Sequence, residues 1–275
     1  MLKKLLRHEW LETWKIPALI SSIILALSAV SALYFHFAAS PAPDVELNVG
    51  NTVLFLGYVM LICSVSLILA VYLGVRFYKN LYTDEGYLMH TLPVKPWMLL
   101  TSKALVASAW LWIVNLLMLL LILPVTMAAL PKLAYFDPGD LSMVSESLLA
   151  TLGGSIPGAL FYLFPYLIVN CAFTAITLYT AVCLGQLFPR HKVLAAILCY
   201  LGINALISTA SSFFILPGMT GVIITHADEA EQFFSLVMPA FMRTIYIISF
   251  FVEIFLSAIL FFVSDYIMRK CLNLD

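Results

Sequence analysis

The sequence predicts an all-α membrane protein with six transmembrane helices, and its composition, apolar run lengths and charge distribution all point to this class. Of its 275 residues, 63% are hydrophobic and 11% are charged, whereas an ordinary soluble domain has roughly 25% charged residues. About 20 helical residues cross a hydrocarbon core about 30 Å thick. The apolar runs that reach this length lie at residues 17–38, 52–76, 98–126, 157–187, 193–216 and 239–267. We expect them to form one transmembrane domain that includes the whole chain.

The charges are segregated along the chain in a way that predicts its orientation. Of the 14 Lys and Arg residues, 12 lie at the N-terminus, in the 76–103 region, in the 190–192 turn and at the C-terminus. Lys132 is in a loop on the other side, and Arg243 is just inside the sixth run. Acidic residues gather in the opposite loops, at Asp44, Glu46, Asp137, Asp140, Glu146, Asp228, Glu229 and Glu231. Cytoplasmic loops carry the excess of Lys and Arg, so both termini are expected in the cytoplasm.

Residues 1–16 predict an amphipathic helix at the inner membrane surface, ended by Pro17. "MLKKLLRHEWLETWK" places most of its cations on one arc and leucines with Trp10 on the other. Glu9 and Glu12 interrupt the apolar arc. Two tryptophans and two acids indicate a helix that packs against protein as well as lipid. The alternative is a simple positively charged flank of the first span.

The most polar long stretch is "FYKNLYTDEGYLMHTLPVKP" at residues 77–96, between the second and third runs. Its charged side chains would each cost about 2.5–3.5 kcal/mol near the bilayer centre. That cost excludes a position inside the membrane. At helical spacing one arc is apolar except for Glu85, and its members are Tyr78, Leu81, Tyr82, Leu88, Met89 and Leu92. The opposite arc holds Lys79, Asn80, Thr83, Asp84, Gly86, Tyr87, His90 and Thr91.

This pattern predicts an amphipathic cytoplasmic helix over residues 78–92, ended by Pro93 and Pro96. One interpretation is a helix that lies at the membrane interface and binds nothing. The other is a docking element for a soluble partner, favoured by interface-type tyrosines. Asp84 and Glu85 also favour docking, because the cytoplasmic membrane surface is itself negative. Glu85 should then meet a basic or donor group of the N-terminal helix or of the partner.

"FYKNLYTDEGYLMHTLPVKPWMLLTSKALVA" resembles the segment between the second and third spans of bacterial ATP-binding cassette (ABC) type-2 export permeases. "LGQLFPRHK" at 184–192 is similar to the second cytoplasmic turn of that family. The family has an amphipathic N-terminal helix and six spans, and a coupling helix between spans two and three docks on the ATPase. This architecture matches nearly the whole chain, and "DEGYLMHTLPV" is its most specific local element.

The resemblance implies a permease subunit in the plasma membrane of a bacterium. It implies two permease subunits, identical or different, with two cytoplasmic ABC ATPase subunits that hold ATP and Mg²⁺. The cargo would be an amphiphile, such as a peptide, a lipid or a hydrophobic drug. The implied coupling residues are Lys79, Tyr82, Asp84, Glu85, Gly86, Tyr87 and His90. Membrane lipid is an expected partner, and nucleic acid is not.

Other recognisable chemistry is missing from the sequence. There is no GxxxxGK[ST] phosphate cradle, HExxH zinc motif or GxSxG nucleophile elbow. The five cysteines lie in the spans or the C-terminal tail, in no CxxC or His/Cys cluster. We therefore expect neither an enzyme nor a resident metal or cofactor in this chain.

Four polar residues lie well inside the predicted spans: Asn115, Asn170, Asn204 and Glu253. For the asparagines, hydrogen bonding between helices is the expected role, and lining a pathway is the alternative. Glu253 should face protein, water or a cation, because a carboxylate inside a membrane is costly. It either lines a substrate path or holds helices together.

Two other functions stay open from the sequence. An ion-gradient-driven secondary carrier could use Glu253 as its proton site. A membrane scaffold or sensor could recruit a cytoplasmic partner without transporting anything.

Overall fold

A computed structural model describes residues 2–39, 48–83, 96–133, 155–188, 190–225 and 238–270. In this part of the chain every regular element is helical, and no strand is present. Six of the helices are long and apolar enough to cross a membrane. The predicted all-α fold with six helices of transmembrane length is therefore confirmed for these residues, and it is consistent with a multi-pass membrane protein.

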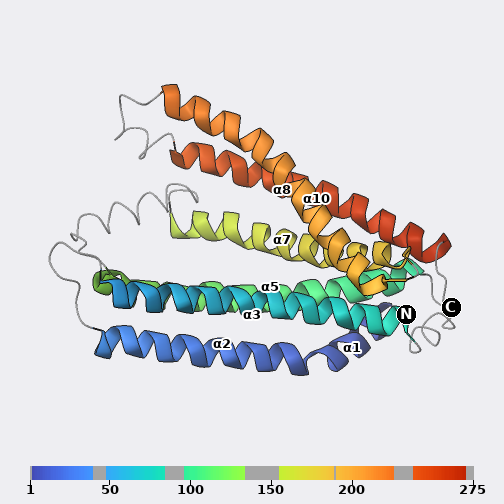
Figure 1. The fold of residues 1–275 in the computed structure, drawn as a ribbon, viewed down its shortest axis with the longest axis horizontal. Helices are drawn as coiled ribbons and strands as arrows, with labels where there is room; N and C mark the ends of the chain where they lie inside the picture. The colour runs from blue at the N-terminus through green and yellow to red at the C-terminus, as the bar shows by residue number, and fades with distance from the viewer. Residues whose placement is uncertain are drawn as a thin grey trace.

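The spans run alternately up and down, so that α1 and the end of α10 lie at the same end of the bundle (Figure 1). We refer to this as the α1 end. In chain order the elements are α1 (Leu2–Thr13), α2 (Lys15–Leu33), the π-helical segment η1 (Tyr34–Ala38), α3 (Val49–Tyr82), α5 (Pro96–Leu133), α7 (Ile156–Gly185), α8 (Lys192–Thr225) and α10 (Met238–Lys270).

The helix α7 is the most buried of the six spans, and it packs against α3, α5, α8 and α10. The main apolar core lies where α7 meets α3 and α5, and its ring stack of Phe77 on Tyr179 has a centroid distance of 3.9 Å. A second core joins α2, η1, α3 and α5 through Phe35, Tyr58, Ile62, Val125 and Ala129. Much of the remaining apolar surface is exposed, as expected for helices that face lipid.

Two predicted boundaries differ from the structure. The N-terminal helix ends at Thr13 instead of residue 16, with the break at Trp14, and Pro17 lies in the first turn of α2. Pro17 has no N–H to donate to the carbonyl of Thr13, so the helix ends where that bond is lost. The second span was expected to end at residue 76, yet α3 continues without a break to Tyr82.

The remaining span boundaries agree within a few residues, except that α5 and α8 extend further than expected at their far ends. Pro96 is the first residue of α5, where the missing N–H of proline has no helical partner to lose. Most of the helix predicted over 78–92 lies outside the described residues, and so does Glu85, whose expected contact with a basic or donor group stays a prediction.

Candidate functional site

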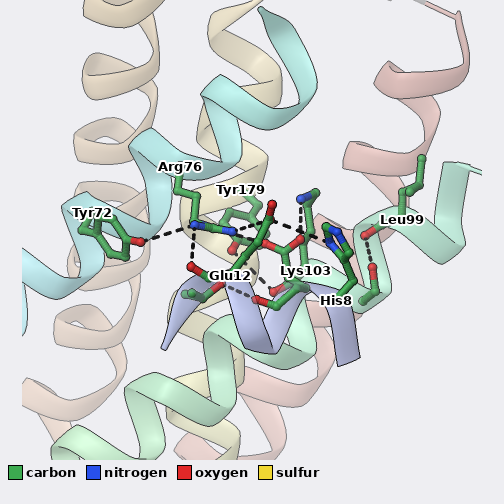
Figure 2. Close-up of polar contacts among 10 residues, drawn as sticks. His8, Glu12, Tyr72, Arg76, Leu99, Lys103 and Tyr179 are labelled. Atoms are coloured by element: carbon green, nitrogen blue, oxygen red, sulfur yellow. Dashed lines mark hydrogen bonds and ion pairs between the residues drawn. The ribbon is translucent and has the colours of Figure 1, made fainter. Parts of the chain in front are cut away.

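The most concentrated group of charges in the described residues joins α1 to the ends of α3 and α5 (Figure 2). The Lys103 ammonium donates to Glu9 Oε2 at 2.8 Å. Arg76 donates through Nε to Glu9 Oε1 at 3.4 Å and through Nη2 to Glu12 Oε2 at 2.7 Å. Glu9 thus forms an ion pair with one cationic side chain from each of two spans. We call Glu9, Glu12, Arg76 and Lys103 the charge cluster.

Local structure explains how these side chains meet. Glu9 and Glu12 are separated by three residues, so they share one face of α1. Arg76 lies on the last turns of α3, and Lys103 on the third turn of α5. Trp10 stacks on Trp110 of α5, with ring centroids 4.5 Å apart and planes at 19°. The stacked rings and the ion pairs together hold α1 against α5.

The charge cluster is buried to different depths at its two carboxylates. Exposed side-chain fractions are 3% for Lys103, 10% for Glu9 and 17% for Arg76, but 46% for Glu12. Removing one member of a buried pair typically costs about 3–5 kcal/mol, because a charge stays behind in a medium of low dielectric constant. An exposed pair contributes about 0–1 kcal/mol. Glu9 therefore holds α1 in place more strongly than Glu12.

Sequence reasoning found half of the charge cluster. Glu9 and Glu12 were expected to pack against protein, and both contact cations of other helices. Arg76 and Lys103 were assigned only to the cationic side of the membrane, and their role as partners was missed. Their positions among apolar residues near the ends of two spans could have indicated that each needs a carboxylate partner.

Of the predicted coupling residues, the structure describes Lys79 and Tyr82. Lys79 is exposed near the end of α3. The Tyr82 hydroxyl donates to Cys183 Sγ of α7 at 3.1 Å, so this side chain points into the bundle. Asn80, expected on the polar arc, is buried. The other coupling residues, Asp84, Glu85, Gly86, Tyr87 and His90, lie outside the described residues.

A cavity of about 870 Å³ lies between α3 and α8, with α5 and α7 at its base. Its lining is mostly apolar, and the polar residues Ser66, Asn115 and Asn170 lie toward the end of the cavity that is farther from α1. The Ser66 hydroxyl donates to Asn115 Oδ1 at 3.5 Å, which links α3 to α5. Asn115 Nδ2 donates to the Leu111 carbonyl at 2.8 Å. Lys79 lines the α1 end of the cavity.

Glu253 connects to this cavity through Asn170. Asn170 Nδ2 donates to Glu253 Oε1 at 3.1 Å, and the Tyr166 hydroxyl donates to the same oxygen at 3.4 Å. Glu253 Oε2 is buried without a hydrogen-bond partner among the described residues. The Glu253 carboxylate thus joins α10 to α7, and Asn170, one of its two hydrogen-bond donors, also lines the cavity.

Asn204 behaves differently from the other asparagines. Its side chain is exposed, and Nδ2 donates to the Tyr200 carbonyl of its own helix at 2.8 Å. Asn204 was expected to form a hydrogen bond to another helix, whereas this bond is to its own helix. As for metals, no three His, Cys, Asp or Glu side chains of the described ranges gather as a metal-binding group.

No family model, curated protein or solved structure matches this chain. Functional inference therefore rests on the residues and their geometry.

Proposed function

We propose that this chain is the membrane subunit of an ABC exporter that moves an amphiphilic cargo with ATP hydrolysed by a separate cytoplasmic subunit. The observation that carries the proposal is the contact of Glu9 with both Arg76 and Lys103. These two cations lie on the helices that flank residues 84–95, one on each side. A push on that segment would therefore move α1, α3 and α5 together.

The same helices connect the segment to the cavity. Both α3 and α5 contribute lining residues, including Ser66 and Asn115. The helix α3 has 34 residues, which is about 51 Å at 1.5 Å per residue. An unbroken helix of this length can transmit a displacement at residue 82 to the middle of the membrane. ATP-driven closure of the partner would then change the shape of the space between α3 and α8.

In this proposal the chemistry of ATP belongs to the partner, because the sequence has no phosphate-binding loop. This chain supplies residues 84–95, which we call the docking segment. It also supplies the helices α3 and α5 that transmit the movement, and the cavity through which the cargo passes. A second permease subunit, a copy or a related chain, completes the assembly. Cargo in the amphiphile class fits a cavity whose walls are apolar and whose polar groups are few.

The test is a double charge reversal in the docking segment, Asp84→Lys with Glu85→Lys. We expect the variant to insert normally but to lose co-purification with a P-loop ATPase identified by mass spectrometry, along with the ATPase activity of the purified complex. The matched control is Asp137→Lys with Asp140→Lys, which makes the same charge change in a loop expected on the other side. If the first variant retains the ATPase and its turnover as the control does, the docking assignment is wrong.

One observation favours a second candidate, an ion-gradient-driven carrier. Glu253 is a carboxyl group inside a span, held by Asn170 and Tyr166 and with one oxygen that has no described partner. Such groups mark proton or ion pathways in many transporters. In sealed vesicles, Glu253→Gln would abolish gradient-driven uptake if this second function is correct. An exporter powered by ATP would keep its dependence on the ATPase in that variant.

A further inference from the structure

The cavity between α3 and α8 has properties that the proposed function does not use. Both helices pack against α7, and the surfaces they turn toward each other line an open space of about 870 Å³. Leu67 and Val71 of α3 and Ile197 of α8 line it and are all more than half exposed. Because these helices are spans, the medium that meets this opening is the bilayer.

The length of the cavity suits one lipid leaflet. Its lining on α3 extends from Cys63 to Lys79, which is about 24 Å along the axis at 1.5 Å per residue. One leaflet is about 15 Å thick in its hydrocarbon core and about 20–22 Å thick with its headgroup region included. An acyl chain can therefore lie along α3 with the headgroup at the α1 end.

The charged side chains described near the α1 end of the cavity are basic. Lys79 lines the cavity at this end and is exposed. The ion pairs formed among the described residues do not include it. Arg190 and His191 are exposed immediately before α8, whose first turn contributes Val193 to the lining. Basic pockets between spans on the cytoplasmic side bind anionic lipid headgroups.

We infer that this cavity is a binding site for a phospholipid with an anionic headgroup, taken from the leaflet at the α1 end. The Lys79 ammonium contacts the phosphate region, and the apolar walls of α3 and α8 hold an acyl chain. The polar group of Ser66, Asn115 and Asn170 marks the depth at which the apolar channel ends. This inference does not depend on the proposed function, because the isolated chain suffices to bind the lipid.

The test uses native mass spectrometry of the purified full chain, released from micelles that contain equal amounts of phosphatidylglycerol and phosphatidylcholine. We expect phosphatidylglycerol to be retained in preference. A single basic residue near an anionic surface contributes about 1 kcal/mol, so Lys79→Gln should reduce the preference roughly five-fold. Ala70→Trp, which fills the cavity from α3, should reduce the retention of both lipids.

Two matched controls accompany these variants. Lys132→Gln removes a lysine at the opposite end of the bundle, and Ala29→Trp adds the same bulk to an exposed face of α2. Both should bind lipid as the unchanged chain does. The inference is overturned if Lys79→Gln keeps the full preference, or if Ala70→Trp retains as much lipid as Ala29→Trp.

A second measurement on the unchanged chain guards against misfolding of the tryptophan variant. Phosphatidylglycerol with a photoactivatable diazirine on its acyl chain should label peptides around residues 63–79 and 193–201. Labelling spread evenly over all exposed spans would show an annular lipid only and would overturn the site. An ATPase that fails to bind would leave both lipid results unchanged, so the two proposals fail separately.

Discussion

Glu9 is the residue on which the position of α1 most depends. It accepts from Lys103 at 2.8 Å and from Arg76 at 3.4 Å, with only 10% of its side chain exposed. A buried carboxylate between two cations is weak evidence for high stability, since hydrophobic replacements of similar size are often as stable. It is better evidence for specificity, because few other arrangements of α1 satisfy all three charges.

Glu9→Ala should lower the free energy of unfolding by about 3–5 kcal/mol, because the buried ammonium of Lys103 loses the carboxylate it contacts. Glu12→Ala, which removes a half-exposed carboxylate from the same cluster, should cost at most about 1 kcal/mol. Equilibrium unfolding of the purified protein in mixed detergent micelles measures both values. Equal losses in the two variants would contradict the ranking by burial.

For single residues, the sequence was sufficient to identify the polar side chains that matter, but not the residues that they contact. Glu9, Asn170 and Glu253 stand out because each is out of place in its surroundings. Their partners lie far along the chain: Glu9 meets Lys103, and Asn170 meets Glu253. Such pairings depend on how the helices are arranged, which helical periodicity within one segment does not encode.

Among the elements, the end of α7 lies close against the start of α8, and of the described glycines Gly185 has the nearest neighbouring atoms. A Cβ atom at Gly185 would lie 2.7 Å from the backbone nitrogen of Ala196. Gly185 is the last residue of α7, and Ala196 lies in the second turn of α8. The absence of a side chain at Gly185 lets the two helices approach at the α1 end, from which the cavity then opens.

Gly185→Ala should destabilise the protein by about 1–3 kcal/mol, because the new methyl group overlaps backbone that cannot rotate away. Gly202→Ala is the matched control, since a Cβ there meets no atom within 4 Å. That second change should be neutral or stabilise α8 by up to about 1 kcal/mol. Thermal unfolding in detergent compares the two, and a neutral Gly185→Ala would show that the helices are further apart than described here.

The number and type of the helices could be predicted from the sequence more reliably than the residues at which each helix ends or the face that it buries. Six apolar runs of sufficient length predicted six spans, because only a helix can satisfy its own backbone across lipid. The faces of α7 and α8 could not be predicted, since both helices are apolar on all sides and show no amphipathic stripe. The cavity between α3 and α8 therefore had no signature in the sequence.

The end of α3 illustrates a second limit. Residues 78–82 were expected to begin a separate coupling helix but continue the second span. The arc of Tyr78, Leu81 and Tyr82 was expected to be the apolar face of that separate helix; in the structure it belongs to α3, and Leu81 is fully buried. Periodicity identifies the inward face of a helix, but it does not show whether two helical patterns in phase form one helix.

For the whole molecule, the even number of spans brings α1 and the end of α10 to the same side (Figure 1). The excess of Lys and Arg at this end predicts that it faces the cytoplasm. An alkaline phosphatase fused after residue 275 should therefore be inactive in bacterial cells, and a fusion after residue 133, following three spans, should be active. The reverse pattern would place the docking segment outside the cell and exclude a cytoplasmic ATPase partner.

The proposed exporter gives these parts one mechanism. In this proposal a partner would push on residues 84–95, Glu9 would keep α3 and α5 moving together, and the space between α3 and α8 would change shape. Each step involves a different part of the chain. Loss of the charge cluster would thus weaken coupling while leaving the cavity and its lipid in place.

The most direct test of this mechanism is site-specific crosslinking from the docking segment. A photoreactive phenylalanine analogue at Tyr87, introduced into the full chain in native membranes, should crosslink to a soluble polypeptide that carries a P-loop motif. The same probe at Tyr34, at the opposite end of the bundle, should give no such product. The central claim would be contradicted if the Tyr87 probe captured only lipid, this chain itself, or proteins without a nucleotide-binding motif.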